Sequence, residues 1–209
     1  MRSFRHAIVS CLLAALPFAA SAECPPDQSK VDAAQTLKPQ AVETITSDIV
    51  LSPDSQAKSV ESFSGAITVH RGARVAGNVE TEHGDLLLEP GAEVGGRLAN
   101  EAGAITLAAA KVRGGIATTQ GDIDIGPDSL VQGGILVRKR NRIGLALGPL
   151  QLGVPSGRST PPRVVIGPGA TVEGKLRFKR EVLLFVSDRA TIGPIEGATP
   201  VYFAGARPD

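Results

Sequence analysis

The sequence predicts an all-β fold, namely a single-stranded parallel β-helix (β-solenoid) of about six coils of 18–20 residues with end caps and one inserted hairpin. One phrase recurs four times, and its turn glycines stand 19, 19 and 18 residues apart, at Gly65, Gly84, Gly103 and Gly121. A second phrase, a valine followed closely by glycine, keeps the same spacing. A fixed period near twenty residues is typical of a solenoid, in which each coil buries its apolar side against its neighbours. Aromatic residues are 3% of the chain, which suits thin coils of aliphatic side chains.

Residues 1–22 have the pattern of a signal peptide. Arg2 and Arg5 precede a mainly apolar run, and Ala20-Ser21-Ala22 has the small-x-small form of a cleavage site. We therefore expect an exported protein, periplasmic or extracellular at the cell surface. Cys24 would be the one cysteine of the mature chain, so no internal disulfide is expected.

Residues 23–59 are expected to form a lead-in and an N-terminal cap. The segment carries Pro25, Pro26, Pro39 and Pro53. Ser29–Leu37 could form a short helix with Ser29 as its cap, and residues 44–51 alternate enough for one strand. A solenoid needs such a cap because its open end exposes unpaired strand edges.

The two-residue period of strands indicates which side chains face inward from Val60 onward. Ile67 and Val69 are expected in the core. A polar inward position recurs in four coils and predicts a structural ladder at Ser62, Thr81, Asn100 and Thr118. A charged position of alternating sign predicts register control by stacked ion pairs at Arg74, Glu93 and Lys111. We expect positive φ at the four turn glycines and at Gly72 and Gly91.

The solenoid is expected to span residues 60–195 with an insertion at 141–162. Ile166–Leu176 matches Ile125–Ile135 at an offset of 41 residues, which is one coil of 19 plus 22 inserted residues. Alternating apolar residues on both sides of Gly148-Pro149 predict a projecting hairpin. Residues 196–209 are expected to form a C-terminal cap with Val201, Tyr202 and Phe203 as its plug.

The charge is unevenly shared between the two halves. Residues 23–130 carry 8 basic and 16 acidic side chains, whereas residues 131–209 carry 12 basic and 5 acidic ones. A basic patch beside the hairpin is the candidate partner-binding surface, with the hairpin leucines next to it: Arg138, Lys139, Arg140, Arg142, Lys175, Arg177, Lys179, Leu145, Leu147, Leu150 and Leu152. It predicts either an anionic envelope polymer or lipid headgroup as partner, or an ordinary solvated face. The unequal charge of the two ends also favours head-to-tail association.

Other chemistry is less well supported by the sequence. Nucleic acid is a poor fit because few aromatic residues interleave with the basic ones. No metal or other cofactor is expected, because His83 beside Glu80, Glu82 and Asp85 has no ligand-spaced partner. No nucleophile–base pairing is visible. The acidic and basic clusters lie in different halves, so we expect no enzyme; a polysaccharide-active β-helix enzyme is the alternative.

The phrases Ile166-Gly-Pro-Gly-Ala-Thr-Val-Glu-Gly-Lys-Leu176 and Gly91-Ala-Glu-Val-Gly-Gly-Arg-Leu98 resemble the repeat of bactofilins, the polymer-forming bacterial cytoskeletal family. They also look like the short-repeat adhesin-type domains of bacterial envelopes. The resemblance covers residues 60–195 outside the insertion. It implies three-sided coils that polymerise end to end without nucleotide. We therefore expect a non-enzymatic envelope protein, a structural scaffold or binding module that can self-associate.

Overall fold

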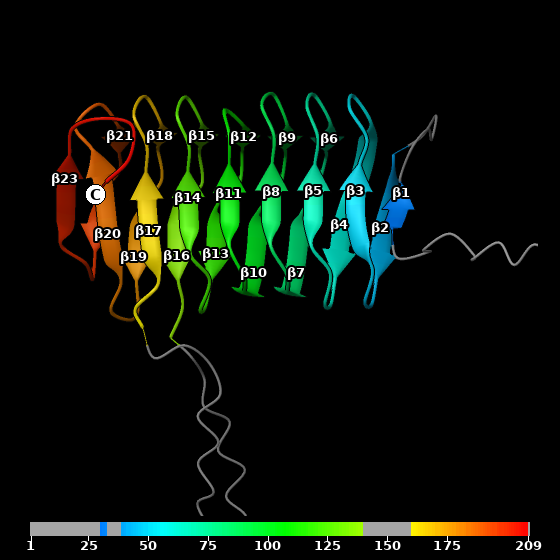
Figure 1. The fold of residues 1–209 in the computed structure, drawn as a ribbon, viewed down its shortest axis with the longest axis horizontal. Coiled ribbons are helices and arrows are strands. Elements are labelled where there is room, and N and C mark those ends of the chain that lie inside the picture. Colours follow the sequence, from blue (N-terminus) through cyan, green and yellow to red (C-terminus); the bar gives the residue numbers. More distant parts are fainter. Residues whose placement is uncertain (1–29, 33–38, 140–159, 209) are drawn as a thin grey trace, which may run out of the picture.

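The computed structural model describes residues 30–32, 39–139 and 160–208, and throughout them the chain forms a parallel β-solenoid (Figure 1). No helix occurs in these residues, and each strand pairs with strands one coil away. The predicted all-β solenoid is confirmed. One sheet has nine strands, in the order β1 (Lys30–Asp32), β3 (Asp48–Leu51), β5 (Ile67–Val69), β8 (Leu86–Leu88), β11 (Ile105–Leu107), β14 (Ile123–Ile125), β17 (Arg163–Ile166), β20 (Leu183–Ser187) and β23 (Pro200–Phe203).

The second sheet has fourteen strands, thirteen of them on a main path that bends at β4 (Gln56–Ser62), which pairs with both β6 and β7. One wing is made of two-residue strands: β6 (Arg74–Val75), β9 (Glu93–Val94), β12 (Lys111–Val112), β15 (Leu130–Val131), β18 (Thr171–Val172) and β21 (Thr191–Ile192). The other wing holds β7 (Val79–His83), β10 (Leu98–Ala102), β13 (Ile116–Thr118), β16 (Ile135–Val137), β19 (Leu176–Phe178) and β22 (Ile195–Glu196); β2 (Gln40–Thr44) pairs with β4 beside it.

The solenoid has about eight turns rather than the six expected. Strands β2, β3 and β4 already lie in register with the coils that follow, and β23 continues the nine-stranded sheet at the other end. The lead-in is hard to recognise as solenoid from the sequence because Asp54 (φ 58°) occupies the left-handed corner that Gly72 (φ 71°) and Gly91 (φ 80°) occupy in the next two coils. At Lys30–Asp32 the chain forms strand β1, not the helix expected over Ser29–Leu37.

Rows of aliphatic side chains, one from each coil, form the core. One row runs through Leu51, Val69, Leu88, Leu107, Ile125, Ile166 and Val186, each at most 1% exposed. Burying such a side chain stabilises a fold by about 1.5–3 kcal/mol relative to leaving it in water. The regular core therefore fixes the register of every outward side chain as well.

The turn glycines are required by crowding more than by their dihedral angles. Gly72, Gly91 and Gly103 have positive φ, at 71°, 80° and 116°, whereas Gly65, Gly84 and Gly121 do not, which corrects that expectation. A β-carbon on Gly84 would overlap the carbonyl oxygen of Gly65, and one on Gly121 would overlap that of Gly103. Each coil therefore needs glycine at this turn because the coil below it leaves no room for a side chain.

The polar ladder is buried as predicted, and its bonds both join coils and close turns. Between coils, the Thr81 Oγ1 donates to the Gly65 carbonyl oxygen (3.2 Å) and the Thr44 Oγ1 donates to the Ser62 Oγ (3.3 Å). The Ser62 Oγ accepts from the Gly65 N–H (2.9 Å), and the Thr118 Oγ1 accepts from the Gly121 N–H (2.9 Å). The charged row also lies in register: Glu93 is placed between Arg74 (3.6 Å) and Lys111 (4.0 Å) on the adjacent coils.

The coils on either side of the predicted insertion pair directly with each other. Strand β14 pairs with β17, and β16 pairs with β19, each in register. Most of the insertion lies outside the described residues, and so do the hairpin leucines Leu145, Leu147, Leu150 and Leu152 and the basic residues Arg140 and Arg142.

Candidate functional site

The outer face of the wing containing β7 and β10 carries two rows of outward side chains. One row, in coil order, is Glu43, Glu61, Glu80, Ala99, Ala117, Leu136, Arg177 and Glu196. The other row, two residues further along each strand, is Ile45, Phe63, Glu82, Glu101, Thr119, Arg138 and Lys179. We call this surface the graded face, because its charge changes from acidic to basic along the solenoid axis.

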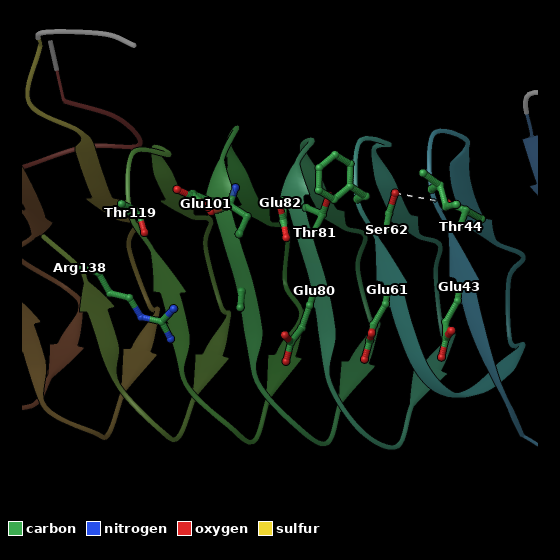
Figure 2. Close-up of a pocket in the computed structure, with 14 residues that line it drawn as sticks. Glu43, Thr44, Glu61, Ser62, Glu80, Thr81, Glu82, Glu101, Thr119 and Arg138 are labelled. Atoms are coloured by element: carbon green, nitrogen blue, oxygen red, sulfur yellow. Dashed lines mark hydrogen bonds between the residues drawn. The ribbon is translucent and has the colours of Figure 1, made fainter. Parts of the chain in front are cut away.

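A groove of about 620 Å³ lies along the acidic part of the graded face. Figure 2 shows Glu43, Glu61 and Glu80 side by side on successive strands, and Glu82 and Glu101 also line the groove. Arg138 lines its far end. The acidic residues and Arg138 belong to different halves of the sequence, yet they share one face because each coil brings residues about 19 apart in sequence into adjacent positions.

Most of these carboxylates have no cation beside them. Glu80 accepts from Arg97 Nε (3.0 Å) and Nη2 (2.9 Å). Among the described residues, no ion pair involves Glu43, Glu61, Glu82 or Glu101. Adjacent coils are about 4.8 Å apart, and like charges directly opposite each other on neighbouring strands destabilise a sheet. The acidic row therefore costs stability in the isolated chain, which favours a role for it outside folding.

Two large apolar side chains flank the acidic row. Ile45 is 75% exposed and Phe63 is 51% exposed. The Phe63 ring lies 5.8 Å from the His83 ring, centroid to centroid, with 56° between the planes. The N-terminal part of the graded face therefore combines negative charge with exposed apolar surface.

The basic patch predicted from the sequence is partly neutralised. Lys175 Nζ lies 2.8 Å from a Glu196 carboxylate oxygen and Arg177 Nε lies 3.4 Å from the other. The hydrogen bond from Lys175 lowers the pKa of Glu196. Lys179 is exposed one coil from Arg138, as the spacing predicted, and neither has an ion pair with a described residue.

The neighbouring basic residues differ in how they are held. Lys139 is exposed beside Arg138. Arg180, which follows Lys179 in the basic run, donates from Nη1 to the Thr119 carbonyl oxygen (3.0 Å) across the graded face. Its position two coils away from Thr119 could be found only from the coil register, not from its place in the basic run.

The C-terminal end of the solenoid leaves a core row open. Tyr202 pairs with Val186 and continues the row of buried aliphatic side chains, yet it is 61% exposed. Val201, its neighbour on the outer side of β23, is 55% exposed. The expected plug of Val201, Tyr202 and Phe203 therefore forms a further strand whose aromatic side chain remains uncovered by the described residues. Residues beyond it turn back over the nine-stranded sheet, where Arg163 Nη2 donates to the Pro208 carbonyl oxygen (3.4 Å).

No group of three or more His, Cys, Asp or Glu side chains within the described ranges is placed to hold a metal ion. The part of the chain that the structure describes has no helix long and apolar enough to cross a membrane. Comparisons with known protein families, curated proteins and solved structures found no match to this chain.

Proposed function

We propose that this protein is a non-enzymatic, exported scaffold of the bacterial envelope that adds copies of itself end to end. The observation that carries the proposal is the open C-terminal coil, where Tyr202 is 61% exposed in a row whose other members are at most 1% exposed. The resemblance of the repeat to bactofilins supports the same reading, and the signal-like residues 1–22 support export.

The chemistry of this end suits another solenoid coil. The Phe203 carbonyl oxygen accepts from the N–H of Asp188, the residue after β20, so alternation along a parallel strand directs the Tyr202 N–H and C=O away from β20. Pro200 has no N–H, so the start of this edge lacks one hydrogen-bond donor. An unpaired edge with an exposed aromatic side chain is a template for pairing with another strand. A coil from a second copy would satisfy both the backbone groups and the ring.

The test compares two adjacent substitutions on β23. Tyr202→Lys places a charge in the open core row and is expected to abolish end-to-end association, since inward-pointing charges protect edge strands. Val201→Lys adds the same charge at a similar exposure on the outer side and is expected to leave association intact. Light scattering and sedimentation of the purified protein give the measurement. The proposal fails if the wild type remains a single monomer at high concentration, or if both variants behave alike.

A polysaccharide-active enzyme is the second candidate, and one observation favours it. The groove brings five glutamates and Arg138 onto one surface, as a glycan-cleaving site on a β-helix would require. Glu61→Gln and Glu82→Gln should then abolish the release of reducing ends from envelope polysaccharides while the circular dichroism spectrum is unchanged. Wild-type protein that releases no reducing ends would remove this candidate.

An anionic partner at the basic patch is also part of the proposal. Arg138, Lys139 and Lys179 are exposed and have no ion pair with a described residue. Cosedimentation with phosphatidylglycerol vesicles tests it, with phosphatidylcholine vesicles as the control. Binding to the anionic vesicles should be lost in Arg138→Glu and retained in Arg113→Glu, which carries the same change of charge on the other wing.

A further inference from the structure

The graded face has a symmetric arrangement of charge about the β13 coil. In the second row, Glu101 lies one coil before Thr119 and Glu82 two coils before it. Arg138 lies one coil after Thr119 and Lys179 two coils after it. The steps are equal because consecutive coils repeat at one spacing, about 4.8 Å. Acidic and basic side chains therefore stand at matching distances on opposite sides of one strand.

The first row has the same arrangement. Glu80 lies two coils before Ala117, and Arg177 lies two coils after it. Ala99 and Leu136 occupy the intermediate positions and are uncharged. Within each row, the charged residues at matching distances up to two coils from the centre are thus of opposite sign; Arg180, bound to the Thr119 carbonyl oxygen, is a further cation at the centre.

We infer that two copies of this chain pair through their graded faces, with the solenoid axes antiparallel and a two-fold axis along β13. An isologous interface of this kind must be self-complementary, so each contact occurs twice. The two-fold axis keeps each row opposite the same row of the partner copy. It sets Glu101 opposite Arg138 of the second copy, Glu82 opposite its Lys179, and Glu80 opposite its Arg177.

The charges on the face support a second copy over other occupants. Glu82, Glu101, Arg138 and Lys179 have no ion pair with any described residue of their own chain, so each is available for a partner. A parallel arrangement of two copies would set like charges against each other, which costs energy at an interface. Two contacts of the antiparallel pair are less favourable. Glu61 faces Glu196, and the Arg180 side chains of the two copies, each donating to its own Thr119 carbonyl oxygen, approach each other at the two-fold axis. The charge of Glu196 is already offset by Lys175 and Arg177.

The area of the graded face indicates how tightly the two copies are expected to bind each other. Seven coils by one five-residue strand give a projected area of about 30 Å by about 16 Å, which is at the low end for a specific interface. The pair is therefore expected to form at micromolar concentration or above. Because its contacts are exposed ion pairs, raising the salt from about 50 mM to about 500 mM should dissociate it.

The test uses charge reversals in a Tyr202→Lys background, so that end-to-end association does not contribute to the measured mass. Glu101→Arg sets two arginines against each other, twice per pair, and Arg138→Glu sets two glutamates against each other. Each variant alone should weaken dimerisation at least about tenfold. An equimolar mixture of the two should restore it, because every reversed residue then meets a reversed partner. Sedimentation velocity at low salt gives the mass.

The matched controls are Arg113→Glu and Glu173→Arg. These exposed residues also stand two coils apart in one row, but on the other wing of the sheet. Neither should change dimerisation, alone or mixed. The inference is overturned if the wild-type face gives a monomer at low salt, if the single reversals leave the dimer intact, or if the mixture stays monomeric. None of these results bears on end-to-end association, which uses β23 and is tested separately by the Tyr202 and Val201 variants.

Discussion

The residues at the left-handed corner of each coil allow a direct test of how backbone strain affects the stability of this solenoid. In successive coils the corner is occupied by Gly91 (φ 80°) and Ala109 (φ 45°), and the Gly91 N–H donates to the Ala109 carbonyl oxygen at 3.0 Å. Both positions are exposed. One coil therefore has the residue that suits left-handed backbone, and the next coil has an alanine held in the same conformation.

The two substitutions Ala109→Gly and Gly91→Ala should have opposite effects. Left-handed backbone costs an L-residue about 1–2 kcal/mol, whereas glycine in place of alanine costs about 0.4–1 kcal/mol through the unfolded chain. The net expectation is a gain of about 0.5–1 kcal/mol for Ala109→Gly and a similar loss for Gly91→Ala. Sterics should not obscure the second value, because the nearest atom to a β-carbon on Gly91 is the Gly72 nitrogen at 3.7 Å.

Thermal unfolding followed by circular dichroism measures both changes. A difference of about 1 kcal/mol should shift the midpoint by about 2–4 °C in a chain of this size. Ala108→Gly is the control: Ala108 is the preceding residue and does not have positive φ, so this change should destabilise. If Ala109→Gly destabilises as much as Ala108→Gly does, left-handed strain at the corner is not what distinguishes Ala109, and the reasoning is wrong.

Three further predictions concern other parts of the solenoid. Gly84→Ala should destabilise by several times the Gly91→Ala value in the same melting experiment, because its β-carbon would overlap the Gly65 carbonyl oxygen. The hydrogen bond from His70 lowers the pKa of Glu89 from its ordinary value of 4.5. The stabilisation that Glu89→Gln removes should therefore be present above pH 4.5 and should vanish as the pH falls through the lowered pKa. Urea unfolding of the wild type and the variant across this pH range measures the difference in stability. Deleting residues 141–162 should leave the circular dichroism spectrum nearly unchanged but weaken binding to anionic vesicles, with a lower melting midpoint because Pro162 is buried and its carbonyl oxygen accepts from the Leu183 N–H at 2.9 Å; a deletion that unfolds the chain would show that the segment belongs to the core.

The fold was largely predictable because close packing between coils restricts which residues can occupy certain positions of each coil. A glycine at the turn after each inward polar residue is required by the coil beneath it, so its period survives in the sequence. The ends were less predictable. Asp54 adopts the corner conformation without being glycine, which concealed the coils before Val60. The sequence predicts Tyr202 as part of a plug in the C-terminal cap, but in the structure its side chain is 61% exposed.

The graded face could not be recognised from the sequence because linear separation hides it. Glu101 and Arg138 are 37 residues apart and belong to halves of opposite net charge, yet the register brings them within two coils on one surface. A count of charges per half indicates polarity along the axis and therefore end-to-end attraction. The pairing shows that the same charges also lie in rows, and that these rows are self-complementary when reversed.

The two proposed surfaces together limit the kind of assembly that can form. End-to-end addition through β23 alone would join copies in one direction and give a polar filament. Antiparallel pairing through the graded faces sets the C-terminal end of one copy beside the N-terminal end of the other, so both poles of the pair become equivalent. A structure grown from such pairs has no distinct ends and can extend equally from either pole. Growth from one pole only would argue against face pairing, even in a protein whose ends associate as proposed.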